Sequence, residues 1–244
     1  MLKIKKSSDI YGFIHIGTLN GWKKILEDEM MEIHKSGLFR ATNTIFVGIA
    51  GEKVPIPHGT KLAVHNPRIE HGENETIRFL HTKSKEFKNA KFWYIHTKGA
   101  RWRVGTQEAI NSQSWRKYMQ FFIIEHWQNC VKSLETHDAC GVEWTRSRWK
   151  GNYIFSGNFW WATSNYLSKI ENPIINDRPF GHDRFKAEFF ISLANPYVEV
   201  FHTLNYGGNL YGKFISPSQY HKNNKKSVFQ NYGRSLPAFA FKLI

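Results

Sequence analysis

The sequence has few of the features that would place it in a specialised class of protein. Only two of its 244 residues are cysteines, Cys130 and Cys140, so we expect reduced thiols and no disulfide framework. It contains no run of about 18 consecutive apolar residues, which argues against a membrane-spanning helix. Residues 1–8 include three lysines and have no apolar signal core. These absences predict a soluble, cytoplasmic protein.

The short motifs of metal, phosphate and serine-nucleophile chemistry are also missing. There is no Cys-x-x-Cys, His-Glu-x-x-His or Asp-x-Asp, and the 12 histidines are scattered without ligand spacing. Gly-x-Ser-x-Gly, P-loop and kinase signatures are absent too. A structural zinc site, a serine hydrolase and a P-loop NTPase are therefore not expected.

The chain is rich in positive charge and in aromatic side chains. Its 34 Lys and Arg residues against 20 Asp and Glu give a formal net charge of +14, and 16% of the residues are aromatic. Such an excess favours anionic partners: nucleic acid, phosphate-bearing small molecules or an anionic membrane surface. The length fits a single domain, and the apolar content of 41% predicts a packed core.

Apolar runs alternate with helical periods, which predicts an α/β fold. The first part reads β-α-β-β-α-β, an order typical of a mainly parallel sheet flanked by helices. A long helix follows, from a start within 106–114 to Leu134, and it has the most regular apolar stripe in the chain. The predicted strands are 11–16, 44–50, 61–65, 92–95, 139–142, 153–155, 159–162 and 197–202.

The stretch from Lys91 to Gly99 combines a predicted buried strand with a basic turn. The turn reads His96-Thr97-Lys98-Gly99, and Arg101 follows it. Open α/β sheets bind ligands at the carboxyl ends of their strands, where lysine beside glycine suits an anionic group. A solvated basic turn explains the same residues equally well.

The end of the first predicted strand is a second candidate for ligand binding. His15, Gly17 and Thr18 lie where a strand gives way to a glycine-rich turn, although the spacing from Gly17 to Gly21 matches neither the P-loop nor the dinucleotide fingerprint. The strand-end rule places His15 near a base or ribose, and simple packing is the alternative.

Residues 155–162, Phe-Ser-Gly-Asn-Phe-Trp-Trp-Ala, form a third candidate. Gly157 and Asn158 interrupt two apolar runs, which favours a bulge or the close approach of a ligand. Trp160 and Trp161 have flat faces that suit a sugar or base, with core packing as the alternative. Farther along, Asp183 and Glu188 form a carboxylate pair, and a helix cap is the alternative for Asp183.

Four blocks together resemble a family of GT-A-fold glycosyltransferases of bacteria and large DNA viruses, and are similar to the chlorovirus rhamnosyltransferase-type domain. The blocks are Tyr94-Ile-His-Thr-Lys-Gly99, Trp115-Arg-Lys-Tyr-Met119 with Trp127-x-x-Cys130, residues 155–162, and Asp183-Arg-x-x-x-Glu188. The resemblance covers roughly residues 10–205. It implies a GT-A-like (Rossmann-like) fold, a nucleotide-diphospho-sugar donor and a glycan or polysaccharide acceptor.

With this resemblance, the sequence is interpreted as one glycosyltransferase domain. Residues 10–103 would form the nucleotide-sugar-binding half, 104–205 the acceptor and catalytic half, and 206–244 an irregular C-terminal extension or lid. The donor would be bound by His15, Gly17, Thr18, His96, Thr97, Lys98, Gly99 and Arg101. The sugar and acceptor pocket would be formed by Gly157, Asn158, Trp160 and Trp161.

The expected reaction is inverting, with Asp183 as general base and Glu188 as the second candidate. Lysine can stabilise the charge of a leaving diphosphate without a metal. The missing Asp-x-Asp leaves Mn²⁺ or Mg²⁺ open as a cofactor, and His202, at a late strand end, is a candidate for a metal or a phosphate.

The predicted partners are a nucleotide-diphospho-sugar such as a UDP-sugar and a glycan or lipid-linked glycan acceptor. No nucleic acid is expected, and peripheral association with a membrane is allowed for. The main alternative is a non-catalytic binding protein for nucleic acid or an anionic glycan. A glycan hydrolase that uses Asp183 and Glu188 is a third hypothesis.

Overall fold

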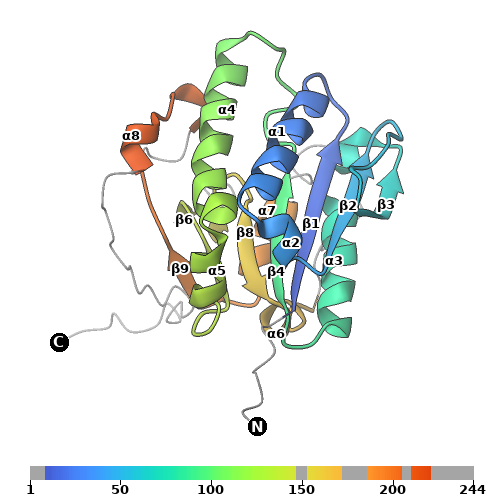
Figure 1. Ribbon diagram of the computed structural model, residues 1–244, viewed down its shortest axis with the longest axis vertical. Helices are drawn as coiled ribbons and strands as arrows, with labels where there is room; N and C mark the ends of the chain where they lie inside the picture. The colour runs from blue at the N-terminus through green and yellow to red at the C-terminus, as the bar shows by residue number, and fades with distance from the viewer. Residues whose placement is uncertain (1–8, 147–152, 172–185, 205–209, 221–244) are drawn as a thin grey trace, which may run out of the picture.

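A seven-stranded mixed sheet forms the centre of the residues that the computed structural model describes, which are 9–146, 153–171, 186–204 and 210–220 (Figure 1). The strand order is β3-β2-β1-β4-β8-β5-β9, and β8 alone runs antiparallel to its neighbours. The strands are β1 (Ile10–Gly17), β2 (Thr44–Ala50), β3 (Lys61–Asn66), β4 (Lys91–His96), β5 (Ala139–Gly141), β8 (Trp160–Thr163) and β9 (Val198–Val200). The predicted α/β class with a mainly parallel, single-domain sheet is confirmed.

Helices cover both faces of this sheet (Figure 1). One face packs against α1 (Trp22–Lys35), α2 (Leu38–Ala41), α4 (Gln107–Gln120) and α5 (Trp127–Ser133). The other face packs against α3 (Asn74–Glu86), α6 (Ser164–Leu167) and α7 (Lys186–Phe189).

Strand β4 shows why the central strands read as unbroken apolar runs. Side chains alternate between the two faces of a strand. Trp93 and Ile95 therefore join the core beneath α1 and α4, while Phe92 and Tyr94 join the core beneath α3. A strand that is buried on both faces needs apolar residues at every position.

The predicted long helix is interrupted. Helix α4 ends at Gln120, a π-helical turn covers Phe121–Glu125, and α5 follows. The backbone N–H of His126 donates to the carbonyl of Phe121 five residues earlier (3.2 Å), which is the bond of a π-turn. The Ile123 carbonyl in this turn accepts a hydrogen bond of 2.9 Å from the Trp161 indole. The Trp161 side chain, from a distant strand, thus satisfies a backbone carbonyl of the π-turn. The spacing of apolar residues along the helix does not predict this contact.

Several short elements complete the described part of the chain. Strands β6 (Trp144–Arg146) and β7 (Tyr153–Phe155) form a small antiparallel sheet, and the sequence did not predict β6. The predicted strand 197–202 shortens to β9, and a 3-10 turn, η1 (Ile69–His71), precedes α3. A second 3-10 turn, η4 (Phe190–Ser192), follows α7.

Within the predicted C-terminal extension, the described residues are 210–220. They contain η5 (Leu210–Gly212) and α8 (Pro217–Tyr220). Leu210, Ile215 and Tyr220 belong to the core that also contains α4, so this segment packs on the body of the domain. Among the helices of the described residues, none is long and apolar enough to cross a membrane.

The close packing of β1 on β4 generates a stability prediction. A Cβ atom at Gly12 would lie 2.2 Å from Cζ2 of the fully buried Trp93. Because overpacking a dense core typically costs about 1–3 kcal/mol, Gly12→Ala should lower the free energy of unfolding by about that amount in urea denaturation. Gly21→Ala is the control, since its Cβ would meet only Val104 at 3.6 Å. Equal effects of the two substitutions would contradict this packing.

Candidate functional site

The candidate site lies at the carboxyl ends of β1 and β4. Strand order reverses between them, because β2 and β3 continue from β1 on one side and β8 follows β4 on the other. In open α/β sheets, ligands bind outside the carboxyl ends of the strands at such a switch point. Thr97 joins the two ends. Its backbone N–H donates to the His15 carbonyl and its hydroxyl accepts from the N–H of Gly17, both at 3.0 Å.

Glu73 lies at the centre of this site, although the sequence analysis did not single it out. Its Oε2 accepts hydrogen bonds from Tyr94 Oη and from Asn158 Nδ2, both 2.6 Å long. Its Oε1 lies 3.5 Å from Nδ1 of His96. The only sequence signal was position, since an acidic residue directly before a helix that follows a strand lies at the carboxyl edge of the sheet.

The carboxyl group of Glu73 is kept ionised. Burial favours the neutral acid, but two effects outweigh it and hold the pKa of Glu73 below its ordinary value: the positive charge that His96 and His15 take up when they are protonated at acidic pH, and the hydrogen bonds from Tyr94 and Asn158. His15 is different, because burial lowers its pKa to about 4 despite the charge of Glu73. His15 Nδ1 also pairs with Thr76 Oγ1 at 2.8 Å, so this histidine is neutral and held in the core.

His96 is held in one tautomer by the backbone of Gly157. Its Nε2 lies 3.0 Å from the Gly157 carbonyl, which can only accept, so Nε2 carries the hydrogen. Burial lowers the pKa of His96 more than Glu73 raises it, which favours the neutral ring. Nδ1 then presents a lone pair toward Glu73 Oε1. Two hydrogen-bond acceptors face each other here, and a ligand hydrogen donor would satisfy them.

Gly157 and Asn158 form a tight turn that belongs to this site. Both have positive φ, 95° and 58°, and the Asn158 N–H donates to the Phe155 carbonyl (2.8 Å). A Cβ at Gly157 would also lie 2.4 Å from the sulfur of Met119. The turn aims the Asn158 side chain at Glu73, while its Oδ1 accepts from the Trp160 indole at 2.8 Å.

The tandem tryptophans lie in the core. Trp160 and Trp161 are both 0% exposed and point to opposite faces of the sheet, so they join two different apolar clusters. Each indole N–H has a protein partner. Core packing accounts for both residues, and neither offers a ring face to solvent.

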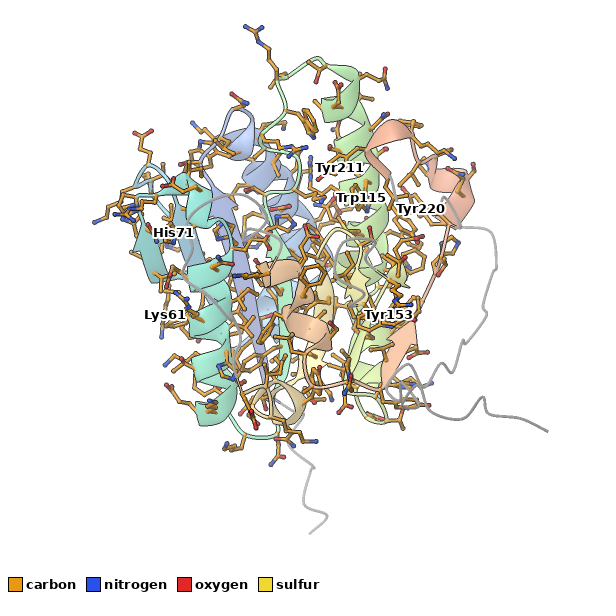
Figure 2. The ribbon with its side chains drawn as sticks, turned by 180° about the vertical axis from the view of Figure 1, so that it is seen from behind. Lys61, His71, Trp115, Tyr153, Tyr211 and Tyr220 are labelled. Carbon is orange, nitrogen blue, oxygen red and sulfur yellow. The ribbon has the colours of Figure 1, made fainter. Side chains whose placement is uncertain are left out.

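The side chain of Lys98 is buried between two aromatic rings. The alternative prediction, a basic turn exposed to solvent, is therefore wrong. Only 4% of the residue is exposed. Its Nζ lies 4.1 Å from the Trp115 ring centre and donates to the hydroxyl of Tyr211 (2.9 Å), and Figure 2 shows these two rings beside each other. Burial lowers the pKa of this lysine, but Tyr211, Glu188 and Glu73 outweigh the effect and raise it above its ordinary value.

Arg116 and Glu29 lie beneath the Lys98 turn. Nη1 of Arg116 donates to the Lys98 carbonyl (2.9 Å), and Nη2 is 4.0 Å from Oδ2 of Asp28. Glu29 is completely buried, neither of its carboxyl oxygens has a hydrogen-bond partner, and burial raises its pKa to about 8. A buried polar side chain in a helix leaves no periodic signal, so the burial of Glu29 and Arg116 could not be predicted from the spacing of apolar residues.

The other residues that were predicted to bind the nucleotide-sugar donor lie around the site and do not form its centre. Gly99 has φ of +91° and faces Ser112 of α4. Thr18 ties the end of β1 to β2 by donating to the Ala50 carbonyl (3.2 Å). The exposed Arg101 stacks over Trp102, with its guanidinium carbon 4.2 Å from the ring centre.

Of the two predicted bases, Asp183 lies outside the described residues. Glu188, on α7, is half-buried and near the site, since its negative charge contributes to raising the pKa of Tyr94 and of Lys98. The structure therefore brings one of the two carboxylates into the neighbourhood of the basic turn.

His202 belongs to a separate polar cluster at the ends of β5 and β9. Its Nδ1 lies 2.9 Å from the hydroxyl of Tyr118, which donates to Glu143 Oε1 (3.2 Å). Burial lowers the pKa of His202 and raises that of Glu143. Within the described ranges, no group of three or more His, Cys, Asp or Glu side chains is placed to hold a metal ion.

Comparisons with known proteins identify a family but no activity. A family model described as a domain of unknown function, DUF8361, matches residues 23–192. No curated protein matches the sequence. Among solved structures, the bifunctional IspDF from Campylobacter jejuni has a TM-score of 0.40 and 7% identity over 85% of this chain and 52% of that one. The chain thus spans about half the length of IspDF.

The buried Glu29 generates a prediction about pH. Its folded pKa of about 8 lies above the ordinary 4.5, so its contribution to stability is complete below pH 4.5 and is lost as the pH rises through 8. Over that interval it should lower the free energy of unfolding by about 1.4 kcal/mol per pH unit. Other groups such as His15 contribute to the pH dependence of both proteins, so in denaturant titrations the slope of Glu29→Gln should be less negative than that of the unsubstituted chain by this amount. Glu27→Gln, at an exposed position of the same helix, should keep the slope of the unsubstituted chain. An unchanged slope in Glu29→Gln would contradict the assignment.

Proposed function

The chain belongs to the family of the domain of unknown function DUF8361, and we propose that it is a GT-A-type glycosyltransferase that uses a nucleotide-diphospho-sugar donor. The observation that carries the proposal is the meeting of a buried lysine, Lys98, with two acceptors, Glu73 and His96, at the switch point between β1 and β4. The mixed sheet with one antiparallel strand is compatible with that architecture. A fold alone assigns no function, so the residues of the site carry the assignment.

Lys98 supplies positive charge where a diphosphate would need it. The ammonium group is buried and charged, and a charge in a site shielded from water stabilises a developing anion more strongly than an exposed one. At present its hydrogen bond goes to the hydroxyl of Tyr211. In the proposed donor complex, a phosphate oxygen takes the place of that hydroxyl.

Glu73 and His96 suit the hydroxyl groups of a ribose or a sugar. Glu73 Oε1 and the lone pair of His96 Nδ1 are 3.5 Å apart, and both require a hydrogen donor. Sugar hydroxyls donate readily, and they also accept, which Asn158 Nδ2 beside Glu73 could satisfy. The acceptor pair therefore favours a glycosyl or ribosyl ligand over a bare phosphate.

The transfer step needs a base. In an inverting reaction the acceptor oxygen attacks the anomeric carbon, the bond from that carbon to the diphosphate oxygen breaks, and a carboxylate takes the acceptor proton. We assign the base role to Asp183, with Glu188 as the second candidate. Lys98 balances the charge that the departing diphosphate gains.

Nucleotide binding tests the proposal. UDP, GDP and TDP sugars and CMP-sugars, each with and without Mn²⁺, are compared in thermal unfolding. A ligand at one hundred times its dissociation constant should stabilise the fold by about 2.7 kcal/mol, or roughly 5–10 °C. Lys98→Met should abolish the shift that a nucleoside diphosphate causes, while Lys117→Met, at an exposed position of α4, should keep it.

The same assay separates the proposal from the alternative of a nucleic-acid-binding protein. Stabilisation by single-stranded oligonucleotides with steep salt dependence, together with no shift from any nucleotide sugar, would overturn the glycosyltransferase assignment.

The base assignment has its own test, which is sugar transfer to a glycan acceptor. Asp183→Asn should lower turnover by orders of magnitude and leave nucleotide binding nearly intact, because the carboxylate acts only when the acceptor proton is removed. Near-full turnover in this variant would contradict the role of Asp183. Loss of turnover in Glu188→Gln alone would move the role to Glu188.

A further inference from the structure

Exposed apolar side chains gather at one end of the molecule. Among the described residues, the large hydrophobic side chains that are exposed are Leu19, Met31, Leu62, Val104, Ile110 and Phe214. Four of these, which we call the docking rim, lie on segments next to the carboxyl ends of β1 and β4: Leu19, Val104, Ile110 and Phe214. Val104 is 80% exposed and Phe214 is 56% exposed. These segments lie at the upper end of the molecule in Figure 1.

Hydrogen bonds join the segments of the docking rim. Asn20, beside Leu19, donates from Nδ2 to the Arg101 carbonyl (2.6 Å). At the other end, the N–H of Ile215, which follows Phe214, donates to Ser114 Oγ (3.0 Å). Ser114 lies on α4 one helical turn after Ile110, so this bond ties the segment of Phe214 to the helix that carries Ile110. The segments that carry the rim are thus held to one another beside the candidate site.

Basic residues are interleaved with these apolar side chains. Arg101, Arg103 and Lys213 are exposed, and each lies within three residues of a member of the rim. The whole chain carries a formal net charge of +14. Apolar side chains at loop tips beside lysine and arginine suit the interface of an anionic bilayer, where apolar groups enter the acyl boundary and cations meet the head groups.

We propose that the docking rim binds the surface of an anionic lipid bilayer. A nucleic acid would require exposed ring faces on which bases can stack. Two of the rings described at this end, Trp102 and Tyr211, are instead packed edge to face (5.8 Å between centres) and covered by the Arg101 guanidinium, which leaves Phe214 as the exposed ring of the rim. Three of the four side chains of the rim are aliphatic, and such side chains suit the acyl chains of lipids better than nucleic-acid bases.

Docking at the rim would hold the carboxyl edge of the sheet against the membrane. Lys98 and Glu73 lie behind this edge, so a membrane-embedded acceptor would be within reach of the site. The acceptor class is then a lipid-linked glycan, and this one consequence rests on the proposed function. Membrane binding itself does not depend on it.

Vesicle co-sedimentation of the full chain, without any nucleotide sugar, tests the proposal. Vesicles of phosphatidylcholine are compared with vesicles of phosphatidylcholine and phosphatidylglycerol at low and high salt. The chain should bind only the anionic vesicles, and salt should release it. Val104→Asp with Phe214→Asp should abolish binding. The control, Met31→Asp with Leu62→Asp, changes two exposed apolar residues outside the rim and should leave binding unchanged.

A second pair of variants keeps the test informative if the aspartate variants fold poorly. Arg103→Gln and Lys213→Gln should each weaken binding to anionic vesicles about fivefold, since one basic residue near a membrane surface contributes about 1 kcal/mol. Absence of vesicle binding, equal binding to neutral vesicles, or equal losses in rim and control variants would overturn the proposal. So would a single-stranded oligonucleotide that binds in preference to the vesicles. None of these outcomes bears on nucleotide-sugar binding.

Discussion

The ionised carboxylate of Glu73 is the interaction on which the candidate site depends. It accepts from Tyr94 on β4 and from Asn158 in the turn before β8, and it faces His96 at the end of β4. A buried charge is costly unless it is hydrogen-bonded and paired, so these partners are held in fixed positions. One side chain from the start of α3 thereby joins a strand end and a turn into a single polar surface.

The positive side of the site has a similar construction. Lys98 is held between Trp115 of α4 and Tyr211 of η5, and Arg116 fixes its carbonyl from below. The aromatic rings keep the ammonium group shielded from solvent and still charged. The site thus combines a charged lysine with two atoms that can accept a hydrogen, Glu73 Oε1 and His96 Nδ1. A nucleotide sugar offers a phosphate to the lysine and hydroxyl donors to the two acceptors. The docking rim, with its neighbouring basic residues, lies at the same edge of the sheet.

Much of the fold could be predicted from the sequence, because β1, β2 and β4 are buried on both faces and therefore apolar at nearly every position. The ends of these strands could be predicted as well, and the structure brings Gly17 and Thr97 into contact there. The rest depends on tertiary contacts. A single carboxylate such as Glu73 leaves no periodic signal, and the π-turn after α4 is tied to Trp161 from a distant strand. Trp160 and Trp161 suggested a sugar site, but an aromatic pair in a strand packs equally well in two cores.

The most direct test of the central claim is an experimental structure of the chain with a nucleoside diphosphate bound. The account predicts that the diphosphate lies at the carboxyl ends of β1 and β4, with a phosphate oxygen in hydrogen-bond distance of Lys98 Nζ in place of the Tyr211 hydroxyl. A ribose hydroxyl, or a sugar hydroxyl in the sugar-nucleotide complex, should contact Glu73 or His96. A nucleotide bound elsewhere, with the Lys98–Tyr211 and Glu73–His96 pairs unchanged, would contradict the account.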